Sequence, residues 1–413
     1  MDNQRDYTHK ISFLGDITLD RPMLKASLQK GGGYVFSGML EGLGALLSES
    51  DCVIGNLETV FAGEEKGYNP GILSYNSPDS LLREIKKLGD PLVLGLANNH
   101  CLDMGIPGLK RTMSLLDQHH ILYTGAGEAM GERFLTLCLK GLRLAVFSCA
   151  SMMNTKENGF PHSIEELQFV NSFFSPREAG IVTWKRRLLC SQPGRWARQK
   201  VLDRRQGRGQ GIIKPYSDNQ PISPAAQEQI SGILTELNQA KKNHDLVMIC
   251  LHSGGQFNEE PGSYTEALME QLAGHADIVA GHHPHVVQRA VWEGETFCAY
   301  SMGSLNMSPS ADYVAPGSLS AYSMALHVYI SQKEERTYIK KISCSFLKAV
   351  EDESAFVRVV PVADLHQASS LSRRAELEND MEQILTRCGI ERREGELIQK
   401  EYEISSKGQP PVL

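Results

Sequence analysis

The stretch Asp277-Ile278-Val279-Ala280-Gly281-His282-His283-Pro284-His285-Val286 joins an apolar run to three histidines. An apolar run closed by glycine predicts a buried β-strand. Three imidazoles so close together can deliver nitrogen ligands to a divalent metal from one short loop. The stretch therefore favours a metal-dependent enzyme over the plainer interpretation, in which these are ordinary polar histidines of a loop.

Four further apolar runs end in the same way, with glycine beside a polar side chain. They cover residues 11–16, 52–58, 92–100 and 246–255. Glycine lets the backbone turn sharply and lets another chain segment approach closely at a strand end. In parallel α/β sheets, ligands collect outside the carboxyl ends of the strands. We therefore expect the polar groups of all these runs to face one crevice.

Strand and helix patterns alternate along most of the chain. Residues 8–150 follow this rhythm, and it resumes at Ser223-Pro224, a typical helix start. Residues 151–221 interrupt it with five prolines and mixed aromatics, which predicts an insertion. Residues 295–301, 321–331 and 336–347 alternate apolar and polar residues, which predicts an antiparallel second sheet. Together these patterns indicate a layered α/β fold.

The strand-end motifs resemble those of a known family. In chain order they are Gly15-Asp16, Gly55-Asn56-Leu57-Glu58, Asn98-Asn99-His100 with Asp103 and Gly105, the His252 segment, Gly281 to Val286, and Tyr300-Ser301-Met302-Gly303-Ser304-Leu305. They are similar in kind and in order to the motifs of the capsule-biosynthesis CapA proteins, also called the poly-γ-glutamate synthesis family. The resemblance spans residues 11 to about 330.

The resemblance implies an α/β fold of the calcineurin-like metallophosphoesterase superfamily, a four-layer α/β/β/α sandwich with an insertion and C-terminal helices. One domain would cover residues 8–350, with the insertion at about 151–221. A C-terminal helical extension would cover residues 351–413.

The resemblance also implies a centre of two divalent ions, Mn, Zn or Fe. These metals accept nitrogen and oxygen ligands, and two of them about 3.5–4 Å apart can clamp an anionic transition state. By the family pattern, one ion would be held by Asp16, by Glu58 or Asn56, and by His285. The other would be held by Asn99, His252 and His283. His282 would lie behind these ligands.

His100 is the expected proton donor to the leaving group. It follows Asn99 directly, and an imidazole there can donate a proton or stabilise negative charge. Asp103 would orient this imidazole through a hydrogen bond. The alternatives are that His100 only caps a loop and that Asp103 is a carboxylate at a helix start.

The chain departs from the family pattern at two places. Metallophosphoesterases usually read Asp-x-His at the first strand, whereas this chain has Asp16-Ile17-Thr18. One metal would therefore lack an imidazole unless Glu58 replaces it. After the fourth-strand histidine, Ser253-Gly254-Gly255-Gln256-Phe257 stands where the family tends to have an aromatic and an acidic residue, which bears on the substrate.

Composition is that of a soluble globular protein. The chain has 413 residues, of which 41% are hydrophobic and 22% charged. It has no apolar run long enough for a transmembrane segment, and its first residues lack the apolar stretch of a signal peptide. Nine cysteines without a CxxC pair fit a reducing compartment. We therefore expect a cytoplasmic protein.

The formal net charge of -7 is unevenly distributed. Residues 185–214 hold ten Lys and Arg against one acid, which leaves a net charge of -16 on the remainder. Long-range attraction to this segment would concentrate an anionic polymer near the crevice. The candidate contacts are Arg195, Arg198, Arg204 and Arg205. The alternative is that this segment is a solvated loop without a partner. No nucleic-acid partner is expected, because the negative charge on the rest of the chain would repel a phosphate backbone.

Two functions remain open on these grounds. The first is a metal-dependent hydrolase of an anionic small molecule or polymer, acting on a phosphoester or a γ-glutamyl amide bond. The resemblance links it to poly-γ-glutamate or capsule polymer metabolism. The second is a non-catalytic, metal-stabilised accessory subunit that binds an anionic polymer in a capsule synthesis or export complex.

Overall fold

The computed structural model describes residues 7–70, 74–127, 134–154, 164–173, 217–311, 314–315, 317–333, 336–390 and 398–404, together with positions 193, 197 and 200. Most of the predicted insertion lies outside these residues. So do the four arginines expected to contact an anionic polymer, Arg195, Arg198, Arg204 and Arg205. Their expected role therefore stays a prediction.

The first sheet has the strand order β13-β12-β11-β1-β2-β3-β4, with β14 pairing to β12. The strands are β1 (His9–Ile17), β2 (Cys52–Leu57), β3 (Leu92–Gly95), β4 (Leu122–Thr124), β11 (Tyr322–Lys333), β12 (Arg336–Glu351), β13 (Val357–Pro361) and β14 (Tyr402–Glu403). β1 to β4 run parallel to one another, and β11 runs antiparallel to β1. The carboxyl ends of β1, β2 and β3 therefore lie at one edge.

The second sheet has the strand order β5-β6-β7-β8-β10-β9. The strands are β5 (Phe134–Leu139), β6 (Leu142–Ala150), β7 (Leu246–His252), β8 (Ile278–His282), β9 (Ala290–Glu293) and β10 (Thr296–Ala299). β6, β7, β8 and β10 are parallel to one another. The ends of β7 and β8, which carry histidines, thus lie side by side.

The two sheets pack face to face, and β7 shows how its sequence allows this. Met248 and Cys250 point into the core between the sheets. The alternate residues Val247 and Ile249 pack on the other face, against helices α9 (Pro224–Asn243) and α10 (Ser263–Leu272). This period of two is what a strand buried on both faces requires.

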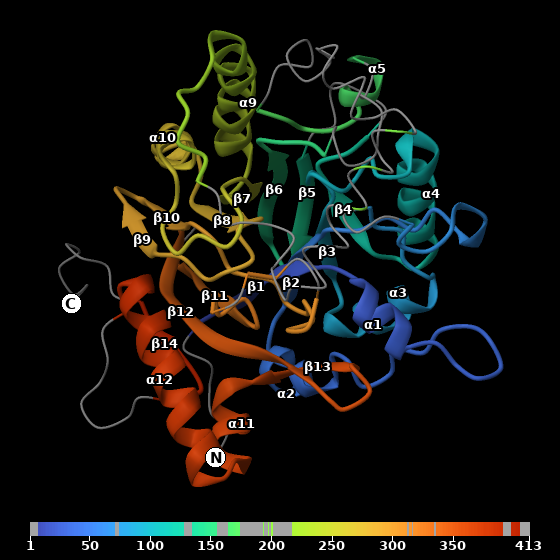
Figure 1. The fold of residues 1–413 in the computed structure, drawn as a ribbon. Coiled ribbons are helices and arrows are strands. Elements are labelled where there is room, and N and C mark those ends of the chain that lie inside the picture. The colour runs from blue at the N-terminus through green and yellow to red at the C-terminus, as the bar shows by residue number, and fades with distance from the viewer. Residues whose placement is uncertain are drawn as a thin grey trace.

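Helices also cover the outer face of the first sheet (Figure 1). They are α1 (Arg21–Ala26), α2 (Gly44–Leu47), α3 (Ser80–Ile85) and α4 (Gly105–Gln118). With α9 and α10 on the far side, the layers run α/β/β/α. The predicted four-layer sandwich is confirmed.

Helix ends follow local sequence signals. The Ser223 side chain accepts the backbone N–H of Ala226 at the start of α9, and Pro224 takes the first helical position. The last long helix, α12 (Leu371–Cys388), is capped by Ser370 before its first residue and by Gly389, in the left-handed conformation, after its last. The expected helix start at Ser223-Pro224 is confirmed.

The antiparallel strands are placed differently from the prediction. Residues 295–301, 321–331 and 336–347 were expected to form an antiparallel second sheet, but β11 and β12 extend the first sheet beside β1. β10 joins the second sheet in parallel with β8. The alternating pattern predicts strands, but it carries no information about which strand is the neighbour. β10 and most of β11 are buried on both faces.

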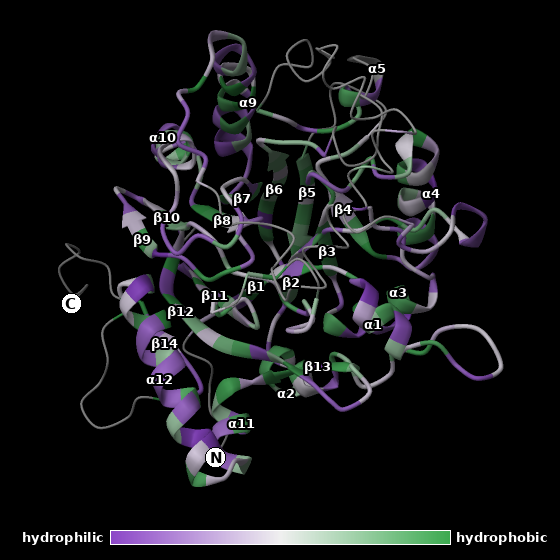
Figure 2. Cartoon of the chain, in the orientation of Figure 1, coloured by the Kyte–Doolittle hydropathy of each residue, from purple (hydrophilic) through white to green (hydrophobic). Residues whose placement is uncertain are grey.

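The C-terminal segment is more than a helical extension. It contains α11 (Val362–Ala368) and α12, and it also contributes β13 and β14 to the first sheet. One face of α12 is buried in the core, through Leu377, Met381, Ile384, Leu385 and Cys388. Figure 2 shows α12 as largely hydrophilic and β5 and β6 as hydrophobic. The expected boundary at residue 350 stays a prediction.

Two strand-end glycines permit close backbone approach. A Cβ added at Gly15 would lie 2.2 Å from the carbonyl oxygen of Gly303, and one at Gly281 would lie 2.1 Å from that of Tyr300. Both contacts join a strand end to residues 300–303, which follow β10. Within the described residues, no helix combines the length and apolar character needed to cross a membrane.

Candidate metal centre

Asp16 near the end of β1 ties the first sheet to the histidine loop that begins at the end of β8. Its Oδ1 atom lies 3.0 Å from Nδ1 of His282, and its Oδ2 atom lies 3.3 Å from Nδ1 of His285. Oδ2 also accepts the backbone N–H of His283 at 3.0 Å. One buried carboxylate therefore positions the whole loop.

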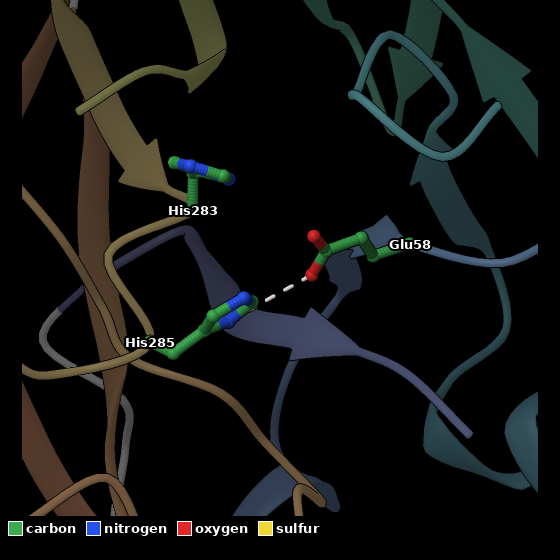
Figure 3. Close-up of side chains that lie close together, drawn as sticks. All are labelled: Glu58, His283 and His285. Carbon is green, nitrogen blue, oxygen red and sulfur yellow. Dashed lines mark ion pairs between the residues drawn. The ribbon is translucent and has the colours of Figure 1, made fainter. Parts of the chain in front are cut away.

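The histidine loop has a strained backbone. His283 has φ 95° and His285 has φ 58°, in the left-handed region that residues with a side chain rarely adopt. Such conformations cost about 1–3 kcal/mol each and persist where surrounding contacts enforce them, commonly at ligand sites. Here the enforcing contacts come from Asp16. Figure 3 shows the His285 imidazole pointing to the Glu58 carboxylate, with His283 to one side of the pair.

Glu58 follows β2 and is fully buried. Its Oε2 atom lies 3.8 Å from Nδ1 of His285, and its Oε1 atom lies 3.6 Å from Nε2 of His252. One ligand atom from each of Glu58, His283 and His285 lies within 4.8 Å of the others. Among the described residues, neither carboxylate oxygen has a hydrogen-bond partner.

His252, at the end of β7, brings a second group of ligand atoms together. Its Nε2 atom lies 2.8 Å from Oδ1 of Asn99 and 3.1 Å from Nδ1 of His283. Its Nδ1 atom lies 3.2 Å from Nδ2 of Asn56. The imidazole is therefore held at one nitrogen and presents the other to Asn99 and His283.

Asn56 uses its carboxamide within the protein. Its Nδ2 atom donates to Oδ1 of Asp16 at 2.8 Å, and its Oδ1 atom accepts from Nδ2 of Asn98 at 3.3 Å. Asn98 in turn donates to the carbonyl oxygen of Leu57 at 2.8 Å. Asn56 thus orients Asp16 and His252, whereas Glu58 has both oxygens available.

His100 is held on several sides. Its Nδ1 atom lies 2.7 Å from Oδ2 of Asp103, and its Nε2 atom lies 3.9 Å from Oε1 of Glu58. The ring of Tyr75 stacks on the imidazole, with centroids 4.1 Å apart. Nδ2 of Asn154 lies 3.2 Å from Nε2. The nitrogen not engaged by Asp103 faces the centre.

Their neighbours separate the protonation behaviour of the two buried carboxyl groups, Asp16 and Glu58. Burial would raise the pKa of Asp16, but the close imidazoles of His282 and His285 outweigh it and hold that pKa well below its ordinary value. Burial, with the charges of Asp16 and Asp103, raises the pKa of Glu58 well above its ordinary value. Asp16 is therefore ionised, and Glu58 has much to gain from a nearby cation.

The imidazoles facing these groups favour their neutral form. Burial, followed by the proximity of His283, lowers the pKa of His252 well below its ordinary value. Burial, followed by the proximity of His285, lowers the pKa of His283 to about 3. A neutral imidazole is the form that binds a metal.

The residues fit a divalent transition metal. Glu58 has two buried oxygens without hydrogen bonds, and Nδ1 of His285 is likewise without one among the described residues. Buried polar atoms in this state are rare and call for a physical cause such as an ion. The donors are imidazole nitrogens and carboxylate and carboxamide oxygens, a mixture that suits zinc, manganese or iron.

The structure brings the sequence-derived candidates into one cluster. They are Asp16, Asn56, Glu58, Asn99, His100, Asp103, His252, His282, His283 and His285. Their individual roles stay predictions. His282 contacts Asp16 from beside the centre, as a residue behind the ligands would.

Three further residues at the site were not singled out from the sequence. Asn98 supports Asn56 and could have been found, because it opens the Asn98-Asn99-His100 motif. Tyr75 and Asn154 reach His100 from loops. Neither carries a local sequence signal.

Comparison with known proteins gives a consistent family. The sequence model described as "Bacterial capsule synthesis protein PGA_cap" matches residues 10–307. The chain is 26% identical over 301 residues to "Capsule biosynthesis protein CapA" of Bacillus anthracis, covering 71% of this chain and 58% of that protein. It is 25% identical over 296 residues to "PGA biosynthesis protein CapA" of Bacillus subtilis, covering 71% and 62%. The chain thus spans about three fifths of the length of these relatives.

Solved structures show weaker likeness. The calcineurin-like phosphoesterase YfkN from Bacillus subtilis is 10% identical with a TM-score of 0.36, covering 90% of this chain and 99% of that one. A hypothetical protein from Thermus thermophilus is 14% identical with a TM-score of 0.35, covering 85% and 97%. The family match covers more than half of the sequence. The chain belongs to the bacterial capsule synthesis protein family PGA_cap.

Proposed function

We propose that this protein is a metal-dependent hydrolase whose centre is built from Glu58, His283 and His285 and the residues around them. The observation that carries the proposal is the buried Glu58 carboxylate. It has no hydrogen bond among the described residues, and it lies among ligand atoms from three strand ends. A cation is the partner that such a carboxylate lacks.

The ligand atoms form two groups that share Glu58. Asp16 and His285 lie on the side of Oε2. Asn99, His252 and His283 lie on the side of Oε1. This arrangement supports two ions, with Glu58 in contact with both groups. Because the Asn56 carboxamide is already hydrogen-bonded, we assign the ligand role at this strand end to Glu58.

The chemistry follows from the charge distribution. When bound, the ions would polarise the scissile group and stabilise negative charge in the transition state. His100 holds a proton on Nδ1 toward Asp103 and presents Nε2 to the centre. With both nitrogens protonated, it would be placed to deliver the Nε2 proton to a leaving group or to stabilise its charge.

An anionic substrate fits the proposed centre. A phosphoester and a γ-glutamyl amide both develop oxyanion character that two cations stabilise. Relatives named for capsule and PGA biosynthesis favour a link to poly-γ-glutamate or another capsule polymer. The expected cytoplasmic location stays a prediction.

One observation favours the second candidate, a metal-stabilised accessory subunit that binds an anionic polymer in a capsule synthesis complex. Thr18 stands where metallophosphoesterases usually have an imidazole. Its N–H donates to Oδ1 of Asn306 at 3.0 Å, and its carbonyl accepts from the same amide at 2.7 Å. This segment is therefore anchored structurally, and it offers no nitrogen ligand.

A metal assay followed by a substrate screen separates the two candidates. Purified protein is assayed for bound Mn, Zn and Fe, then tested on p-nitrophenyl phosphate, bis-p-nitrophenyl phosphate and a γ-glutamyl peptide. The hydrolase predicts turnover that EDTA abolishes and added metal restores. Metal at full occupancy without turnover on all three substrates would favour the accessory subunit. The variant Glu58→Gln, equal in size, should lose both metal and turnover.

A further inference from the structure

Asn154 follows β6 and contacts both residues of the Asn99-His100 pair. Its backbone N–H donates to the carbonyl oxygen of Asn99 at 3.1 Å, and its side-chain Oδ1 accepts from Nδ2 of Asn99 at 3.0 Å. Its Nδ2 atom lies 3.2 Å from Nε2 and 3.3 Å from Nδ1 of His100. One half-buried side chain thus links the proposed amide ligand to the proposed proton donor.

The hydrogen bond to Asn154 decides which way the carboxamide of Asn99 faces. Only the oxygen of a carboxamide offers lone pairs to a cation, because its NH₂ group is a donor. Since Nδ2 of Asn99 donates to Asn154, Oδ1 of Asn99 points the other way, 2.8 Å from Nε2 of His252. If Asn154 lost its acceptor, the amide could turn over and withdraw this oxygen.

The distances to His100 place the Asn154 amide over the imidazole ring. Nδ2 of Asn154 lies 3.3 Å from Nδ1 and 3.2 Å from Nε2 of His100. If it lay in the plane of the ring at these distances, it would overlap the Cε1 carbon between the two nitrogens, so it lies above the ring. Tyr75 already stacks on this imidazole at 4.1 Å with an interplanar angle of 20°. Two groups cannot share one face at these separations. Tyr75 and Asn154 therefore lie on opposite faces and restrict rotation of the ring.

We infer that Asn154 is a positioning residue that turns the Asn99 oxygen toward the metal and fixes the His100 ring for the substrate. The inference rests on the proposed function. Removing a group that orients a metal ligand typically costs about 10–100-fold in metal affinity or activity. The two roles use different atoms of one carboxamide, Oδ1 for Asn99 and Nδ2 for His100, so substitution can separate them.

The first test measures metal affinity without reference to turnover. Full-length protein is stripped with EDTA and titrated with Mn²⁺ by calorimetry. Asn154→Leu removes the acceptor, and we expect the Kd to rise about 10–100-fold. Asn154→Asp keeps an acceptor oxygen for Asn99, and we expect its Kd to stay within about threefold of the wild type or to tighten.

The second test measures kcat and KM on the p-nitrophenyl substrates at saturating Mn²⁺. Both variants lose the N–H above the His100 ring, so kcat should fall about tenfold or more in each. KM should change less, because the ring acts on the leaving group. A variant that is well folded and metal-loaded yet slow is the signature of a positioning residue.

Asn171→Leu is the matched control for folding. Asn171 is buried nearby and donates to the carbonyl of Ser148 at 3.2 Å, but it belongs to neither ligand group. It should lower the melting temperature as much as Asn154→Leu and leave the Kd for Mn²⁺ unchanged.

Several outcomes would overturn the inference. An Asn154→Leu variant that binds Mn²⁺ like the wild type would refute it, as would an Asn154→Asp variant that loses affinity equally. In both cases the proposed hydrolase would stand. A wild-type chain that binds Mn²⁺ but turns over no substrate would refute the hydrolase, while the titrations would still decide the role of Asn154 toward Asn99. A wild type that binds none of Mn²⁺, Zn²⁺ and Fe²⁺ would refute both.

Discussion

Oδ2 of Asp103 lies 2.7 Å from Nδ1 of His100 and accepts the backbone N–H of Tyr75 at 2.6 Å. One carboxylate oxygen thus fixes the imidazole and also the aromatic residue that stacks on it. Because Nδ1 is engaged in this way, Nε2 is the nitrogen that faces Glu58. In the proposed hydrolase, Asp103 would therefore affect catalysis through His100.

Asp103→Asn should lower kcat about 10–100-fold while leaving metal content unchanged. The amide can still accept from Tyr75, but it removes the charge that stabilises a protonated His100. The check is a double-mutant cycle on kcat with His100→Ala. If Asp103 acts through His100, the double variant should be no slower than His100→Ala alone. Additive losses would assign Asp103 a separate role.

His100→Ala should keep its metal and lose about 10²–10⁴ in kcat, the range that general acid catalysis contributes. Elemental analysis and steady-state kinetics on the same preparation measure both. Equal loss of metal and activity would instead make His100 a ligand. A leaving group of low pKa should shrink the effect, because it needs little protonation.

His285→Ala should lower metal content, since this imidazole lies within reach of both Asp16 and Glu58. Alanine keeps the Cβ that makes a φ of 58° costly, so the backbone strain remains in this variant and any loss of metal reports the missing imidazole. Metal per chain, measured after gel filtration, is the readout. His366→Ala, at a histidine paired with Glu378 far along the chain, is the control and should keep full occupancy. Full occupancy in His285→Ala would exclude this histidine as a ligand.

The strand ends could be predicted because each carries its signal locally. Gly15 precedes Asp16 in the sequence, and the structure explains the glycine by the approach of Gly303. Asp16 and Glu58 come together because β1 and β2 are parallel neighbours whose carboxyl ends lie at one edge of the first sheet. His252 reaches them from the end of β7 in the second sheet, so this contact also depends on how the two sheets pack.

The rest depends on contacts that no local pattern encodes. The pairing of β11 with β1 could not be read from alternation, because alternation fixes the face and leaves the neighbour open. Asn154 reaches His100 across a separation of 54 residues. Its segment shows no periodicity, so only the folded chain identifies it. β14 likewise adds only Tyr402–Glu403 to the sheet, too short a run to stand out.

His327 predicts how the fold responds to acid. It is buried, with Nδ1 2.8 Å from the Ser12 hydroxyl and Nε2 3.2 Å from that of Ser345. Burial, followed by the positive charge of Lys10, lowers the pKa of His327 to about 3, whereas the charge of Glu401 opposes the shift. The unfolded state therefore binds this proton more readily than the folded state does. The contribution of neutral His327 to the free energy of unfolding is therefore complete above pH 6.5, the ordinary pKa of histidine. It is lost as the pH falls from 6.5 toward 3.

We therefore expect the free energy of unfolding to fall between about pH 6.5 and 4 in the wild type and to fall less steeply in His327→Gln. Glutamine can still hydrogen-bond to both serines but has no proton to gain. Urea unfolding at several pH values, on metal-free protein, measures the slope. Equal slopes in both proteins would show that other groups control acid stability.

The basic segment tests whether the substrate is a polymer. Arg195, Arg198, Arg204 and Arg205 belong to a region of high positive charge on a chain with net charge -7. Long-range attraction would raise the local concentration of a polyanion and would weaken as salt screens it, over about 8–10 Å at physiological ionic strength. Changing all four to Gln should raise KM for a long anionic substrate, spare p-nitrophenyl phosphate, and flatten the salt dependence. The matched control changes four other cations, Lys242, Lys333, Arg336 and Lys340, to Gln. This control alters the net charge equally, so a similar rise in its KM would show that net charge alone causes the effect. Unchanged KM values in both variants would show that the substrate is not an anionic polymer recruited by this segment.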